Sequence, residues 1–97
     1  MRLIKVIGKT PFDYEKISVT TAVRRLDETK RNTYSAVLLT IETTDIRYRI
    51  DGGDPSATDG HLVYATQNLY FEDPKTVRNL RMITASGTAT VHVTYYK

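Results

Sequence analysis

Asp45-Ile46-Arg47-Tyr48-Arg49-Ile50 is the stretch that decides the fold, because charged and apolar side chains alternate along it with a period of two. In an extended chain the side chains at 46, 48 and 50 point to one side and those at 45, 47 and 49 to the other. The apolar side is built from β-branched and aromatic residues, as in a strand with one buried and one wet face. The stretch therefore predicts a half-buried β-strand.

The same alternation recurs along the chain. Near the C-terminus Val91, Val93 and Tyr95 occupy every second position, and Gly87 predicts the turn before this strand. Other strands are expected at residues 3–7, 16–21, 34–42, 61–65, 69–72 and 79–84. The polar segment 22–30 lacks an apolar stripe, so we expect a loop or one helical turn there. About seven or eight short, mostly antiparallel strands predict an all-β fold, either a small β-sandwich or a barrel-like sandwich.

A chain of 97 residues without cysteine predicts one domain, residues 1–97, with a thin core. Neither disulfides nor thiolate metal sites support that core. Association of copies would bury further apolar surface, so we expect a homo-oligomer. Gly8-Lys9-Thr10-Pro11 is the candidate linker, and it sets residues 1–11 apart as an N-terminal arm or an edge strand.

The net charge of +3 comes from basic residues scattered among acidic ones, most visibly in the segment 24–31. Such a mixture is typical of a solvated loop and does not favour a nucleic-acid partner. The apolar start of the chain is short and interrupted by Lys5, so it does not predict a signal peptide. No stretch is long and apolar enough to predict a membrane span, so we expect no membrane partner.

No catalytic constellation is recognisable, so the chain is expected to be neither an enzyme nor a cofactor-binding protein. Catalysis needs a nucleophile beside a base, paired carboxylates or a metal cluster. His61 and His92 are the two histidines, and each lies in an expected strand without the spacing of a metal pair. We interpret both as structural residues.

The most distinctive loop is Asp51-Gly52-Gly53-Asp54-Pro55-Ser56-Ala57-Thr58-Asp59-Gly60. Its aspartates, Asp51, Asp54 and Asp59, are candidate oxygen ligands for a cation such as calcium. Glycines fill two early positions where an EF-hand loop needs acidic or amide side chains. Asp and Gly are also the residues that tight turns select. A structural turn without a metal is therefore the favoured interpretation.

Seven tyrosines and no tryptophan make an unusual aromatic balance. Tyr48 and Tyr95 fall on the core-facing side of their strands. Exposed tyrosines would favour an interface, because they offer a large contact area at a low cost in rotamer entropy. Core tyrosines with hydroxyls at the rim are the favoured alternative for any one of them, and Tyr96 is the candidate for an interface.

The segment Ile46-Arg47-Tyr48-Arg49-Ile50-Asp51-Gly52-Gly53-Asp54-Pro55-Ser56 follows the pattern I-R-Y-x-x-D-G-x-D-P-[ST]. It resembles the strand and turn of chitobiase C-terminal-type β-sandwich modules. This local resemblance implies a carbohydrate-binding module.

A longer resemblance, over residues 37–97, is to small virion proteins of tailed bacteriophages that are usually encoded among the head genes. It combines the same segment with three later blocks in the same order and spacing, Gly60-His61-Leu62, Asn79-Leu80-Arg81-Met82-Ile83 and Ser86-Gly87-Thr88-Ala89-Thr90-Val91-His92-Val93-Thr94-Tyr95-Tyr96. Residues 1–15 and 22–31 have no counterpart in it.

The phage resemblance implies a structural subunit of the virion, a capsid decoration or cement protein made in the host cytoplasm and bound to the capsid surface. Its partners would be the major capsid protein or other virion proteins, and a head–tail or tail accessory role is open as well. In this hypothesis the apolar arm adds a strand to a neighbouring copy or to the capsid. Pairing within its own sheet is the equal alternative. Beside Tyr96, the candidate interface residues are Leu3, Ile4, Val6 and Ile7.

Overall fold

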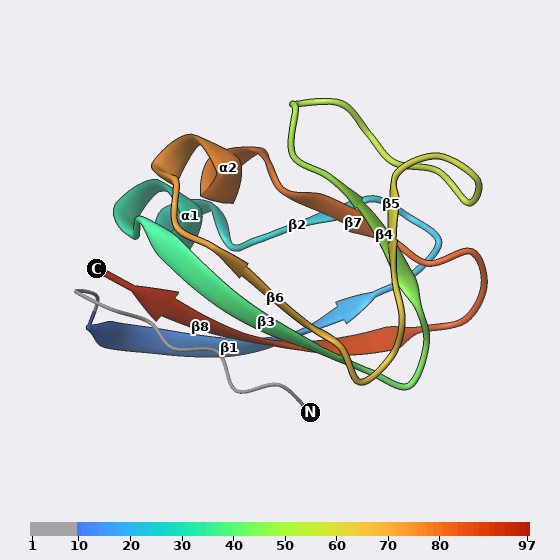
Figure 1. Ribbon diagram of the computed structural model, residues 1–97, viewed down its shortest axis with the longest axis horizontal. Helices are drawn as coiled ribbons and strands as arrows, with labels where there is room; N and C mark the ends of the chain where they lie inside the picture. Colours follow the sequence, from blue (N-terminus) through green and yellow to red (C-terminus); the bar gives the residue numbers. More distant parts are fainter. Residues whose placement is uncertain (1–9) are drawn as a thin grey trace.

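The computed structural model describes residues 10–97, which form two four-stranded antiparallel sheets (Figure 1). Sheet A has the strand order β1 (Pro11–Val19), β8 (Ala89–Tyr96), β3 (Ala36–Glu42) and β6 (Asn68–Phe71). Sheet B has the order β2 (Arg24–Arg25), β7 (Arg81–Ile83), β4 (Ile46–Arg49) and β5 (His61–Val63). The predicted all-β sandwich is confirmed.

One apolar core lies between the two sheets, and both contribute every second residue of their strands to it. Tyr95 is fully buried, as its register predicts, and Tyr48 is half-buried against the same cluster. Removing these side chains from water is the main stabilising contribution to the fold. The strands supply the following core residues: Ile17, Val19, Val37, Leu39, Ile41, Ile46, Val63, Met82, Ala89, Val91, Val93 and Tyr95.

Two short helices, α1 (Glu28–Thr33) and α2 (Pro74–Asn79), contact each other at one end of the sandwich (Figure 1). Each begins at an aspartate whose side chain accepts a hydrogen bond from the backbone N–H three residues later, Asp27 for α1 and Asp73 for α2. α2 also adds the fully buried Val77 to the core, whereas α1 buries none of its side chains.

The segment 22–30 differs from the expectation of a loop or one helical turn. Its residues 24–25 pair with β7 as β2, and α1 starts at Glu28 and continues to Thr33. α2 was not expected either. Both departures have a tertiary cause, because a two-residue strand exists only through its partner and a six-residue helix is too short to be stable alone. The strand expected at residues 3–7 lies outside the described residues.

Candidate functional site

The loop 51–60 folds back over the outer face of sheet B and is held there by arginines. Arg47 Nε donates to the carbonyl of Ala57 at 3.1 Å, and its Nη1 donates to the carbonyl of Gly60 at 2.9 Å. Pro55 is buried although it belongs to a loop, and a Cβ added at Gly60 would lie 3.2 Å from the Pro55 Cβ. The solvent-facing side chains predicted for β4 therefore anchor this loop.

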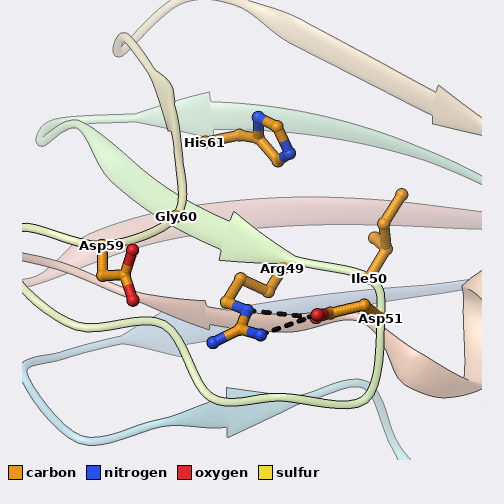
Figure 2. Close-up of a pocket in the computed structure, with 6 residues that line it drawn as sticks. All are labelled: Arg49, Ile50, Asp51, Asp59, Gly60 and His61. Atoms are coloured by element: carbon orange, nitrogen blue, oxygen red, sulfur yellow. Dashed lines mark hydrogen bonds and ion pairs between the residues drawn. The ribbon is translucent and has the colours of Figure 1, made fainter.

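Arg49 makes the closest contacts with the loop. Its Nη2 lies 2.6 Å from Asp51 Oδ2 and its Nε 3.0 Å from Asp51 Oδ1, which makes a bidentate pair (Figure 2). Its Nη1 donates to the carbonyl of Asp54 at 3.2 Å. A Cβ added at Gly53 would clash with Arg49 Nη2, so the guanidinium fills the space that a side chain would need.

This pairing sets the charge state of Asp51. The hydrogen bonds from Arg49 lower the pKa of Asp51 from 3.8 to about 2, and the backbone N–H of Gly53, 3.2 Å from Oδ1, is the second cause. The same hydrogen bonds raise the pKa of Arg49. Asp51 is therefore ionised at neutral pH and committed to a guanidinium group.

A hollow with a volume of about 490 Å³ opens beside this pair. The ring of His61 lies at its wall and packs on Tyr48, with ring centroids 5.2 Å apart. A small polar group in this hollow would thus meet a carboxylate, an imidazole and an apolar side chain. Figure 2 shows the lining residues, Arg49, Ile50, Asp51, Asp59, Gly60 and His61.

The three candidate cation ligands have different surroundings. Asp51 is paired with Arg49, Asp54 Oδ1 lies 3.2 Å from Arg81 Nε, and Asp59 lines the hollow. Within residues 10–97, no three His, Cys, Asp or Glu side chains form a group that could hold a metal ion. The loop is instead organised around guanidinium groups.

The outer face of sheet A carries aromatic side chains. Tyr14 of β1 is 55% exposed on this face. The strand register places Tyr14 in one row across the sheet with Leu38 and Tyr70. Tyr96, the interface candidate of β8, is half-buried on this face and meets Tyr70 edge-on, with ring centroids 6.1 Å apart. We call Tyr14, Leu38, Tyr70 and Tyr96 the aromatic face.

Three polar side chains from neighbouring strands form a hydrogen-bonded line on the same side of sheet A. The Tyr14 hydroxyl lies 2.6 Å from His92 Nδ1, and Glu42 Oε1 lies 2.9 Å from His92 Nε2. The rings of Tyr14 and His92 also stack, with centroids 6.1 Å apart. Sequence reasoning missed this line because Tyr14 and His92 are 78 positions apart, and only strand pairing brings them together.

Outside the described residues lie the other interface candidates, Leu3, Ile4, Val6 and Ile7. The described chain begins at Thr10, which exchanges two backbone hydrogen bonds of 3.2 and 2.9 Å with Lys97. β1 then forms one edge of sheet A. At this edge the Tyr14 N–H donates to Asp13 Oδ1 at 2.8 Å, which occupies one donor that another strand would use.

No known protein family, curated protein or solved structure matches this chain. The resemblances to phage virion proteins and to chitobiase-type modules therefore stay predictions. Among residues 10–97, the helices lack the length and hydrophobicity that crossing a membrane requires.

Proposed function

We propose that the protein is a non-enzymatic structural subunit of a tailed-bacteriophage virion, a capsid decoration or cement protein that acts through protein–protein contacts. The observation that carries this proposal is the aromatic face, with Tyr14 more than half exposed on the edge strand of sheet A. Aromatic side chains are enriched in protein interfaces, where they bury much area for little loss of rotamer entropy.

The resemblance to phage virion proteins supports the same function. Its blocks correspond to β4 with the loop 51–60, to β5, to β7 and to β8. β8 is a central strand of sheet A, and β7 and β4 are the two central strands of sheet B. The resemblance thus extends over the framework that presents the aromatic face, whereas β1, which supplies Tyr14, lies outside it.

Binding to capsids that lack the protein tests this function. The full chain, added to capsids of the phage that encodes it, should saturate a fixed number of lattice sites. Tyr14→Ser should weaken binding about tenfold or more, as truncation of an interface anchor does. Tyr64→Ser is the matched control, because Tyr64 is 56% exposed, against 55% for Tyr14, and follows β5 of the other sheet.

Two results would contradict the proposal. If the wild-type chain binds no virion component, the proposed function is wrong. If Tyr14→Ser and Tyr64→Ser weaken binding equally while both remain folded, the aromatic face is not the docking surface.

A carbohydrate-binding module is the second candidate function, and the exposed rings of Tyr14 and Tyr64 favour it. The C–H groups of a sugar ring pack on aromatic rings that are open to solvent, as these two are. Calorimetry with chito-oligosaccharides tests it. Binding that Tyr14→Ser or Tyr64→Ser abolishes, together with no binding to capsids, would favour this function over the first.

A further inference from the structure

Three arginines form a row across neighbouring strands of sheet B. Arg25 of β2 lies opposite Arg81 of β7, and Arg81 lies opposite Arg49 of β4. Met82, the next residue of β7, is fully buried, so the row faces away from the core. Like charges directly opposite each other destabilise a sheet. The row therefore needs anions to neutralise it.

Arg25 is the member of this row without an anion of its own. Arg49 pairs with Asp51, and Arg81 Nε lies 3.2 Å from Asp54 Oδ1. Among residues 10–97, no carboxylate forms an ion pair with Arg25. Its guanidinium thus has no ion-pair partner among these residues, and the carboxylates of Asp54 and Glu28 favour its charge only from a distance.

Two N–H groups of Arg25 and Arg81 also lack an acceptor. Arg25 Nε and Arg81 Nη1 are buried and have no hydrogen-bond partner within the described part of the chain. Arg25 Nη2 donates to the carbonyl of Arg78 at 2.6 Å, which fixes the guanidinium in place. Burial lowers the pKa of Arg25, and the guanidiniums of Arg31 and Arg81 lower it further, whereas Asp54 raises it. Unpaired buried donors are costly, so an acceptor would be bound strongly here.

We infer that Arg25 and Arg81 form a binding site for a single carboxylate, supplied by an Asp or Glu side chain of a neighbouring protein in the assembled particle. The inference rests on the proposed function, which supplies the neighbouring protein that carries the carboxylate. The two carboxylate oxygens accept from the two unpaired N–H groups in charge-assisted hydrogen bonds. The incoming carboxylate competes with the Asp54 side chain, which is 69% exposed and already touches Arg81.

The surrounding charges favour one carboxylate over a nucleic acid. Asp51, Asp54 and Asp59 are all exposed on the loop that borders the row. A nucleic-acid strand would bring successive phosphates against these carboxylates, and its affinity depends on many uncompensated cations. A single carboxylate needs only the unpaired guanidinium of Arg25. The site lies on the sheet opposite the aromatic face, so it serves a second neighbour in a lattice.

Acetate is the probe for this site. The full chain, labelled with ¹⁵N in arginine, is titrated with sodium acetate and, separately, with sodium chloride at the same ionic strength, and NMR follows the Nε–Hε resonances. We expect saturating shifts at Arg25 and Arg81 in acetate alone. Arg25→Gln should lower the acetate affinity about tenfold or more, which is the loss of one charge-assisted hydrogen bond. Asp54→Asn should raise the affinity because it removes the competing carboxylate.

Arg24→Gln is the matched control. Arg24 precedes Arg25 on β2 and points to the other face of the strand, so its loss should leave the acetate affinity unchanged. The backbone amide spectrum of each variant reports whether it is folded, and a variant that does not fold is replaced by Arg25→Lys, which keeps the charge but lacks the Nε–H group.

Equal shifts in acetate and chloride, or an unchanged acetate affinity in a folded Arg25 variant, would overturn the inference. Shifts with inorganic phosphate or a short single-stranded DNA, without shifts in acetate, would overturn the assignment to a carboxylate. The titration needs no capsid. If the chain binds capsids but not acetate, only this inference fails. If it binds acetate but not capsids, only the proposed function fails.

Discussion

The phenol of Tyr95 donates a hydrogen bond to the carboxylate of Glu15, 80 positions away on the neighbouring strand of sheet A. Tyr95 is fully buried, and the same Glu15 oxygen accepts from the backbone N–H of Asp27 at 3.3 Å. Asp27 is the N-cap of α1. One carboxylate thus connects sheet A to the start of a helix.

Loss of this hydroxyl should be costly. Tyr95→Phe leaves Glu15 with one fewer donor, and we expect the free energy of unfolding to fall by about 1.5–3 kcal/mol, the range for hydrogen bonds to charged groups. Urea denaturation measures it. Tyr34→Phe is the control, since the Tyr34 ring lies 5.4 Å from that of Tyr95 and its hydroxyl has no hydrogen bond within residues 10–97. An equal loss in both variants would contradict the role of the hydroxyl.

The same tyrosine should make stability fall at alkaline pH. Burial, followed by the hydrogen bond to Glu15, raises the pKa of Tyr95 above its ordinary value of 10.0. A pKa that is higher in the folded than in the unfolded state stabilises the protein below the unfolded value, and this contribution is lost as pH rises beyond it. Above pH 10 the free energy of unfolding should therefore decline more steeply for the wild type than for Tyr95→Phe. Parallel declines would show that Tyr95 titrates normally.

Gly53 and Arg49 should be energetically coupled. Gly53→Ala places a Cβ where it clashes with Arg49 Nη2, so the guanidinium must move and its contacts with Asp51 are broken. In an Arg49→Ala background the same change meets no guanidinium. A double-mutant cycle in urea should give a coupling free energy of about 1 kcal/mol, within the range for residues in contact. If the two changes in unfolding free energy are strictly additive, the loop requires glycine at position 53 for a reason other than the Arg49 guanidinium.

Asp51 should contribute stability that disappears in acid. Its pKa is about 2 in the folded protein against 3.8 ordinarily, so its contribution is present above pH 3.8 and lost as the pH falls towards 2. A ¹³C NMR titration of the carboxyl group measures this pKa directly. Arg49→Gln should raise it towards 3.8, whereas Arg47→Gln, which loses contacts at the far end of the loop, should not. A value unaffected by Arg49→Gln would assign the effect to the backbone of Gly53.

The two helix caps should differ in their effect on global stability. Asp73 accepts from the Thr76 N–H at 3.1 Å, and α2 carries the fully buried Val77, so Asp73→Ala should cost about 1 kcal/mol of unfolding free energy. Asp27→Ala should expose α1 amides to hydrogen exchange with a smaller global cost, because α1 buries no side chain. A larger loss of unfolding free energy for Asp27→Ala than for Asp73→Ala would contradict this prediction.

Local signals were sufficient for most strands. Along β4 and β8 the alternation predicted both the extended conformation and the buried side, because the side chains of a strand alternate whatever it pairs with. Asp73-Pro74 also carried a signal for α2 that the sequence analysis did not use, since Asp is a preferred N-cap and Pro suits the first helical turn. The polar loop after β4 was interpreted as a turn, but its anchoring by arginines was not foreseen.

β2 and the arginine row had no comparable signal. Arg24-Arg25 is too short for any period to be detected, and it becomes a strand only through its pairing with β7. The charges of the segment 24–31 were interpreted as those of a solvated loop. In the folded chain one of them, Arg25, is instead held opposite Arg81 with a buried and unpaired Nε.

The sequence by itself therefore determined most strands, β2 excepted, and which of their faces is buried, since both follow from the residue-by-residue alternation of polar and apolar side chains. Only the tertiary structure decided which strands are neighbours. It placed Tyr14 on His92 and Arg25 opposite Arg81, pairs that are distant in the chain. Strand order and register depend on the free energy of the whole core, to which both sheets contribute, and no local pattern contains that information.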